Sequence, residues 1–244
     1  MKLLFTLIAF LMLLSVPVIH ADVNAEAEEY FRRGNVFYNN REFDSATEIY
    51  SEAIRLDPFN VRMYVARGRA YLEKGDAYRA IEDFDYAIGL DPNNAAIFSY
   101  RGYANFSRAA FDQAIADFDR AIMLDPNDGW SFFSRGYTFF NTGNFYQAIV
   151  DFSRSIYLDP NNAYAYNNRG YLFLILGDYD RAIADSSEAI RLDPDLAFAY
   201  SNRGEAYLGN GDYERAIEDF EITLRLEPNH PYVRDNLERA LQGL

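Results

Sequence analysis

Apolar and small residues recur along most of the chain at the spacing of an α-helix. From Ala27 to His230 the sequence divides into six blocks of 34 residues: 27–60, 61–94, 95–128, 129–162, 163–196 and 197–230. Apolar or small side chains stand at positions 4, 8 and 11 of most blocks, and again at positions 20, 24 and 27. Because this i, i+4, i+7 spacing is typical of an amphipathic helix, each block predicts two helices.

Four positions hold the same kind of residue in every block. Position 4 is aromatic, position 8 is glycine, position 20 is alanine and position 32 is proline. Glycine and alanine carry almost no side chain, so they allow two helix backbones to approach closely. The aromatic residues fill the space beside them, and proline ends the second helix.

The segment between the two helices predicts a tight turn. It reads GDAY, GNFY, GDYD or GDYE in four blocks, where the glycine ends the first helix and the next residue caps the second. The turn glycines are Gly75, Gly143, Gly177 and Gly211. Block 3 has Ala109 instead of the glycine, and Asn94 and Asn162 are candidate caps for the following blocks.

This combination of residues closely resembles the tetratricopeptide repeat, a helix–turn–helix unit of 34 residues. The resemblance implies an all-α, right-handed solenoid of six repeats over residues 27–230. Residues 22–26 precede the first repeat as a lead-in. The tail at 231–244, PYVRDNLERALQGL, is expected to form a C-terminal capping helix that covers the apolar face of the last repeat.

Two repeated charges depart from the family pattern. Position 7 is arginine in every block, and position 23 is aspartate in all but the first. We interpret them as structural pairs, in which an arginine fork binds a nearby carboxylate; a ladder of ligand-binding arginines is the alternative. The residues are Arg67, Arg101, Arg135, Arg169 and Arg203, with Asp83, Asp117, Asp151, Asp185 and Asp219.

Residues 1–21 have the layout of a secretory signal peptide. Lys2 precedes an apolar run, Pro17 follows it, and Ala21 stands before the first acidic residue. We expect cleavage after Ala21, a secreted or periplasmic protein, and no membrane contact after cleavage. An uncleaved membrane anchor and the lumen of the endoplasmic reticulum are the alternatives.

The amino-acid composition limits the ligands and the kinds of catalysis that this chain can support. The formal net charge is −14, which opposes binding to the phosphate backbone of nucleic acids. Cysteine is absent, and the two histidines are His20, within the signal peptide, and His230. The absence of cysteine excludes thiol-dependent catalysis and thiolate metal sites, and one histidine outside the signal peptide argues against histidine-dependent catalysis and histidine-rich metal sites. We expect no enzyme activity, no cofactor and no metal.

The resemblance also implies that positions 2, 5, 6, 9, 12 and 13 of each repeat line a concave groove that holds ligands. These positions are rich in aromatic residues, mostly in repeats 3 to 5, and asparagines stand beside them. Clustered aromatic side chains on an accessible face are typical of a binding surface. The candidate groove residues are Tyr100, Tyr103, Phe106, Trp130, Phe133, Tyr137, Phe140, Tyr164, Asn167, Asn168, Tyr171 and Phe198.

We therefore expect a non-catalytic scaffold that holds an extended segment or a helix of another protein in this groove. One alternative is a carbohydrate-binding module of a polysaccharide-export or wall-associated system, with the rings stacking on sugars. The other is that the rings only pack against each other as the wall of the solenoid. The clamp with which some family members hold a C-terminal carboxylate is missing, and the sequence does not specify an oligomeric state.

Overall fold

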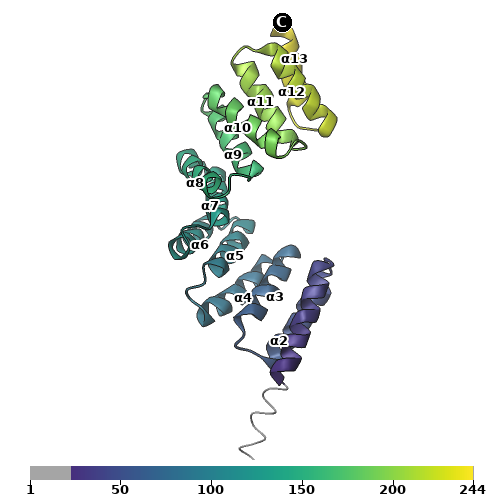
Figure 1. The fold of residues 1–244 in the computed structure, drawn as a ribbon, viewed down its shortest axis with the longest axis vertical. Helices are drawn as coiled ribbons and strands as arrows, with labels where there is room; N and C mark the ends of the chain where they lie inside the picture. The colour runs from purple at the N-terminus through teal and green to yellow at the C-terminus, as the bar shows by residue number, and fades with distance from the viewer. Residues whose placement is uncertain (1–22, 244) are drawn as a thin grey trace, which may run out of the picture. The chain divides into compact units, whose positions relative to one another are not determined.

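The computed structural model describes residues 23–243, and the predicted signal peptide lies outside them. These residues form thirteen helices and no strand (Figure 1), which confirms the predicted all-α fold. The first helix covers residues 23–39 and so includes most of the predicted lead-in. The later helices form pairs in which the first helix begins at residues 61, 95, 129, 163 and 197, at intervals of 34 residues.

The chain divides into two compact units, with the boundary between Leu124 and Asp125. In the first unit, the helix at 23–39 is followed by α2 (Phe43–Leu56), α3 (Val61–Glu73), α4 (Ala77–Leu90), α5 (Ala95–Ser107) and α6 (Phe111–Leu124). The second unit contains α7 (Gly129–Asn141), α8 (Phe145–Leu158), α9 (Ala163–Ile175), α10 (Tyr179–Leu192), α11 (Ala197–Gly209), α12 (Tyr213–Leu226) and α13 (Val233–Gly243).

Each helix pair closes where the glycine at position 8 meets the residue at position 24. A Cβ atom added to Gly68 would lie 2.6 Å from the ring of Phe84, and one added to Gly204 would lie 2.7 Å from the ring of Phe220. Both rings are fully buried. In these two pairs, close packing therefore requires glycine at position 8.

The turns between paired helices have the backbone that their glycines predict. Gly75, Gly143, Gly177 and Gly211 have φ values between 75° and 77°, in the left-handed region that favours glycine. Of the predicted caps, Asp76 accepts a hydrogen bond from the backbone N–H of Arg79 at 3.1 Å, and Asn162 accepts one from that of Ala165 at 3.0 Å. Asn94 and Asn144 make no such bond, so those two predictions were wrong; the amide of Asn94 instead donates to Asp91 at 3.1 Å.

The last helix, α13, covers the apolar face of the final helix pair. Its Val233 and Ala240 are fully buried in one cluster with Tyr207 and Phe220. Leu237 packs against the same cluster. This contact brings the C-terminal tail beside α11 and α12, where residues of the tail line a pocket.

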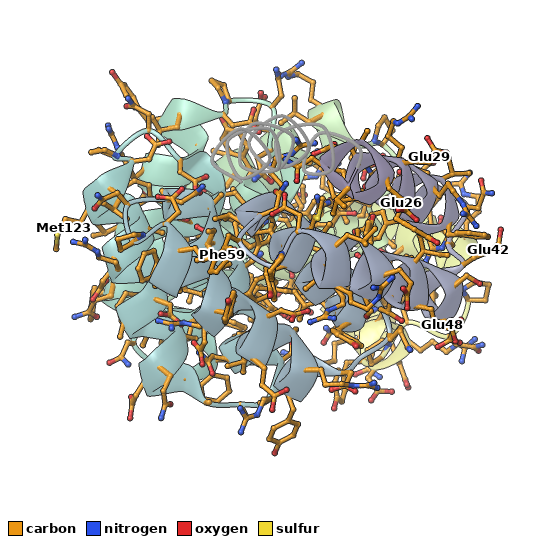
Figure 2. All side chains as sticks on the ribbon, turned by 90° about the horizontal axis from the view of Figure 1, so that it is seen from below. Glu26, Glu29, Glu42, Glu48, Phe59 and Met123 are labelled. Carbon is orange, nitrogen blue, oxygen red and sulfur yellow. The ribbon has the colours of Figure 1, made fainter. Side chains whose placement is uncertain are left out.

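Several glutamates are exposed at the start of the first unit. Figure 2 shows Glu26, Glu29, Glu42 and Glu48, all exposed, directed away from the helix at 23–39 and from α2. Within residues 23–243, no helix is long and apolar enough to cross a membrane.

Candidate functional site

The second unit contains an open pocket of about 770 Å³ lined by residues of α7, α9, α11 and the C-terminal tail. Its size falls within the range of ligand-binding pockets in proteins. Eight of the twelve predicted groove residues line it: Phe133, Tyr137, Phe140, Tyr164, Asn167, Asn168, Tyr171 and Phe198. The pocket also takes residues that we did not select from the sequence: Leu196, Ser201, Asn202, Glu205, His230, Pro231, Tyr232 and Asn236.

The aromatic residues of the pocket serve two different purposes. Phe133 and Phe140 pack against the core of the α7–α8 pair, and the centroids of the Phe133 and Phe152 rings lie 5.6 Å apart. In contrast, Tyr164 and Phe198 are 57% and 47% exposed. The two phenylalanines therefore belong to the wall, whereas Tyr164 and Phe198 present apolar area to solvent.

Ring-to-ring contacts run along α7 and connect it to α9 beside the pocket. Phe133 stacks on Tyr137 with their centroids 6.3 Å apart. Phe140 meets Tyr171 edge-on at 5.8 Å. Such contacts fix the orientation of each ring, so this side of the pocket is already formed without a ligand.

Amide side chains form a polar strip between the rings. Asn202 on α11 donates a hydrogen bond to Asn167 on α9 at 2.9 Å, and both residues are buried. This bond satisfies one donor and one acceptor and leaves further amide groups of the pair available. Asn168 and Ser201 line the same pocket. The strip can therefore hydrogen-bond to a backbone or a hydroxyl group.

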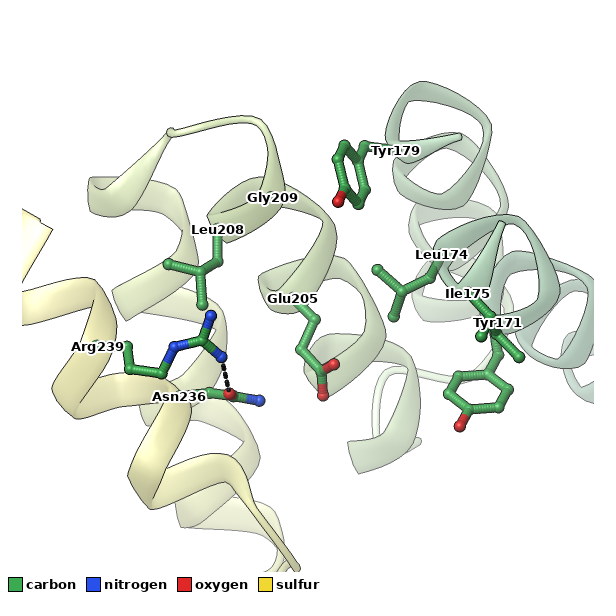
Figure 3. Close-up of a pocket in the computed structure, with 9 residues that line it drawn as sticks. All are labelled: Tyr171, Leu174, Ile175, Tyr179, Glu205, Leu208, Gly209, Asn236 and Arg239. Atoms are coloured by element: carbon green, nitrogen blue, oxygen red, sulfur yellow. Dashed lines mark hydrogen bonds between the residues drawn. The ribbon is translucent and has the colours of Figure 1, made fainter. Parts of the chain in front are cut away.

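One end of the pocket is charged. Glu205 on α11 lines it together with His230, at the end of the last repeat, and Asn236 on α13. Burial raises the pKa of the Glu205 carboxyl above its ordinary value, and the nearby His230 and Arg239 oppose this effect. Beyond Glu205 lies a second hollow of about 320 Å³, drawn in Figure 3, which also includes Tyr171, Asn236 and Arg239.

Four predicted groove residues lie elsewhere. Tyr100, Tyr103 and Phe106 belong to α5 in the first unit. Tyr100 stacks on Phe84 with the ring centroids 5.9 Å apart, and Tyr103 is exposed. Trp130 stands at the start of α7, in the second unit, and is half-exposed outside the pocket.

The structure brings together all five predicted arginine–aspartate pairs. In the best-formed pairs the guanidinium donates two hydrogen bonds to one buried carboxylate. Arg67 donates to Asp83 from Nε at 2.9 Å and from Nη2 at 2.7 Å. Arg203 donates to Asp219 from the same two nitrogens, both at 2.8 Å. The other pairs are Arg101 with Asp117, Arg135 with Asp151 and Arg169 with Asp185.

Most of these arginines also reach the preceding repeat. Arg169 donates to the hydroxyl of Ser153 at 2.9 Å, and Arg101 donates to Asp85 at 2.6 Å. In the third repeat, the buried amide of Asn105 joins the pair by donating to Asp117 at 2.9 Å. These contacts occupy the guanidinium donors, so the arginines connect repeats rather than face a ligand.

No cluster of three or more histidine, cysteine, aspartate or glutamate side chains suited to a metal ion occurs within residues 23–243. The pocket offers half-exposed rings, amides and a carboxylate. Such a set can bind a ligand, but the pocket shows no nucleophile held by a base.

These features define an α-helical repeat protein with a preformed pocket in its second unit. Tetratricopeptide repeat models match residues 31–95, 65–129, 131–162, 152–184 and 197–230, and a TPR repeat model matches residues 170–211. The chain therefore belongs to the tetratricopeptide repeat family. No curated protein sequence matches it.

Several solved structures share this fold. Pseudomonas aeruginosa pilF aligns with a TM-score of 0.78 over 87% of this chain and 97% of its own, at 17% identity. PilW, a type IV pilus biogenesis factor, gives 0.75 over 88% and 98%, at 19% identity. YrrB, a TPR protein with an unusual peptide-binding site, gives 0.64 over 80% and 97%, at 21% identity. At these identities the likeness is one of fold.

Proposed function

We propose that this protein is a non-catalytic scaffold that holds an extended segment of a partner protein in the pocket of its second unit. The observation that carries the proposal is the pairing of half-exposed rings with a polar strip in one preformed pocket. Tyr164 and Phe198 offer apolar area, and Asn168 and Ser201 lie beside them. An extended peptide presents side chains and backbone amides alternately, so both kinds of group find a partner.

Two further observations support a protein ligand. Tetratricopeptide repeats commonly mediate protein–protein interaction, and YrrB shows that a protein of the same fold has a peptide-binding site.

The layout of residues 1–21 favours export of the scaffold to the periplasm or the exterior. Two of the fold neighbours are pilF and PilW, and the latter is a pilus biogenesis factor.

A library of displayed random peptides of about 12 residues tests the proposal, because it samples many segments without requiring that the partner be identified first. The chain without residues 1–21 is the bait, and a Tyr164→Ala, Phe198→Ala variant is the comparison. The matched control is Tyr146→Ala, Tyr157→Ala on α8, where both rings are 74–75% exposed and lie outside the pocket. Circular dichroism establishes that all three proteins are folded.

We expect the wild type and the α8 variant to enrich the same peptides, and the pocket variant to bind them at least about tenfold more weakly. No enrichment by the wild type, or equal binding by the pocket variant, would overturn the proposal. A parallel array of neutral glycans covers the alternative, since rings and amides also bind sugars. Glycan binding without peptide binding would replace the proposed partner by a carbohydrate.

A further inference from the structure

A carboxylate interrupts the run of rings along the pocket. Position 9 of the repeat is tyrosine in three successive repeats, Tyr103, Tyr137 and Tyr171, and becomes Glu205 in the last. Tyr137, Tyr171 and Glu205 all line the same pocket. The change therefore places an acidic group at the end of an aromatic surface.

Glu205 has no close partner of its own. No other residue within 23–243 makes a hydrogen bond or an ion pair with its carboxylate, although Arg239 and His230 are near enough to influence its pKa. Arg239 donates instead to the side-chain oxygen of Asn236 at 3.1 Å. Figure 3 shows this bond, and in that view the Glu205 carboxylate lies apart from it, between Asn236 and Tyr171.

His230 is also directed elsewhere. Its Nδ1 lies 2.9 Å from the backbone carbonyl of Pro231, a contact that requires the proton on Nδ1. Its Nε2 is buried without a hydrogen-bond partner among the described residues, and its ring contacts Phe198 at 4.7 Å between centroids. Neither Arg239 nor His230 therefore forms a hydrogen bond or an ion pair with the Glu205 carboxylate.

A partly buried carboxylate without a close partner favours a cation in its vicinity. Burial penalises the charged form of the Glu205 side chain, which its raised pKa reflects, and an added positive charge offsets that penalty. The faces of Tyr164, Tyr171 and Phe198 attract the same charge through their ring electrons. An apolar group would leave the carboxylate without a counter-charge, and an anionic group would be repelled by it.

We propose that this end of the pocket receives a cationic side chain, lysine or arginine, from the bound partner segment, with Glu205 as its counter-charge and the neighbouring rings as its walls. This inference rests on the proposed peptide-binding function, and it specifies the chemistry of the peptide. It assigns Glu205 a role in specificity, whereas Tyr164 and Phe198 supply affinity for any segment.

The displayed peptide library provides the test when a Glu205→Gln variant is added as bait. Glutamine keeps the shape of the side chain and removes its charge. The matched control is Glu218→Gln, which removes one exposed charge from α12 in the same repeat, outside the pocket. Synthetic copies of an enriched peptide, with its basic residue kept or changed to glutamine, are then titrated by calorimetry against the three proteins.

We expect the wild type and Glu218→Gln to enrich peptides with lysine or arginine at one fixed position, and Glu205→Gln to lose that preference. Neutralising the basic residue should weaken binding about 10- to 30-fold in the wild type and less than about threefold in Glu205→Gln.

Enriched peptides without a basic position, or an equal preference in Glu205→Gln, would overturn this inference and leave the peptide-binding function intact. No enriched peptide at all would overturn both. A preference that is lost equally in Glu218→Gln would also overturn it, because the attraction would then come from overall charge. The two failures are thus distinguishable.

Discussion

At the scale of single residues, the repeated arginine–aspartate pairs are the main polar contacts inside the helix pairs. A guanidinium has five donors in a planar fork, so it can bind both oxygens of a carboxylate and still reach a third group. Arg203 does this with Asp219 and with the hydroxyl of Ser187, the latter at 3.2 Å. Arg33 marks the exception, because Ile49 stands where the aspartate would be and the arginine is exposed.

Removing one partner of such a pair should be costly. Asp219 is only 3% exposed, so Asp219→Ala would leave the Arg203 guanidinium partly buried without its counter-charge. We expect a loss of about 3 kcal/mol in the free energy of unfolding, measured by urea titration. The double variant Arg203→Met, Asp219→Leu should recover much of it, because buried apolar residues of similar volume need no counter-charge.

The control for this prediction is Glu188→Ala, which breaks the exposed pair with Arg191 on α10. Solvent screens an exposed ion pair, so its loss should change the free energy of unfolding little. If Asp219→Ala destabilises the protein no more than Glu188→Ala does, the buried pairs do not hold the helices together.

At the scale of elements, the turn after each first helix depends on one residue with positive φ. Four repeats have glycine there, whereas the first and third have Arg41 and Ala109, with φ values of 63° and 57°. The bond that closes the turn is the same in both kinds, although Lys74 donates to the carbonyl four residues back and Arg108 to the carbonyl three residues back. Ala110 donates to the carbonyl of Asn105 at 2.9 Å, as Asp76 donates to that of Tyr71 at 2.8 Å. The two turns therefore share a left-handed residue and the closing bond, although the residue at that position differs.

Exchanging the residues at this position should therefore move stability in opposite directions. Ala109→Gly removes the steric strain of a left-handed alanine and should stabilise the protein by about 1 kcal/mol. Gly75→Ala should destabilise it by a similar amount, since an added Cβ would meet no atom within 4 Å and the cost is conformational alone. Thermal unfolding measures both. Shifts of the same sign would show that local packing and not φ decides the turn.

The helices could be predicted from the sequence because the same residues recur at fixed positions of each repeat, which shows where each repeat begins and ends. Fixed glycine, alanine and proline positions locate every pair, and counting within the repeat located Tyr164, Tyr171 and Phe198. Glu205 and Asn202 also stand at groove positions, but a candidate list made mostly of aromatic residues, with Asn167 and Asn168 as its polar members, left them out. Tyr232, His230 and Asn236 could not be placed, because they close the pocket from the end of the last repeat and the tail beyond it, where counting positions does not say which face a residue presents.

At the scale of the whole molecule, excess negative charge affects how fast a partner arrives. The formal net charge is −14 and the isoelectric point is about 4.5. A charge of this size attracts a basic segment over distances comparable to the Debye length, about 10 Å at 0.1 M salt. The attraction is not selective, because it acts on any basic peptide. It should therefore govern the association rate, while the contact with Glu205 governs how long the peptide stays.

Salt separates these two contributions. For a peptide enriched in the proposed selection, raising the salt concentration from about 50 to about 500 mM should slow association about tenfold. The copy in which glutamine replaces the basic residue should change less. Glu205→Gln should mainly raise the dissociation rate, because charge inside a pocket is screened far less than charge in solvent. Surface plasmon resonance measures both rates. If Glu205→Gln changes only the association rate, Glu205 acts as one more surface charge, and the pocket does not select the cation by contact.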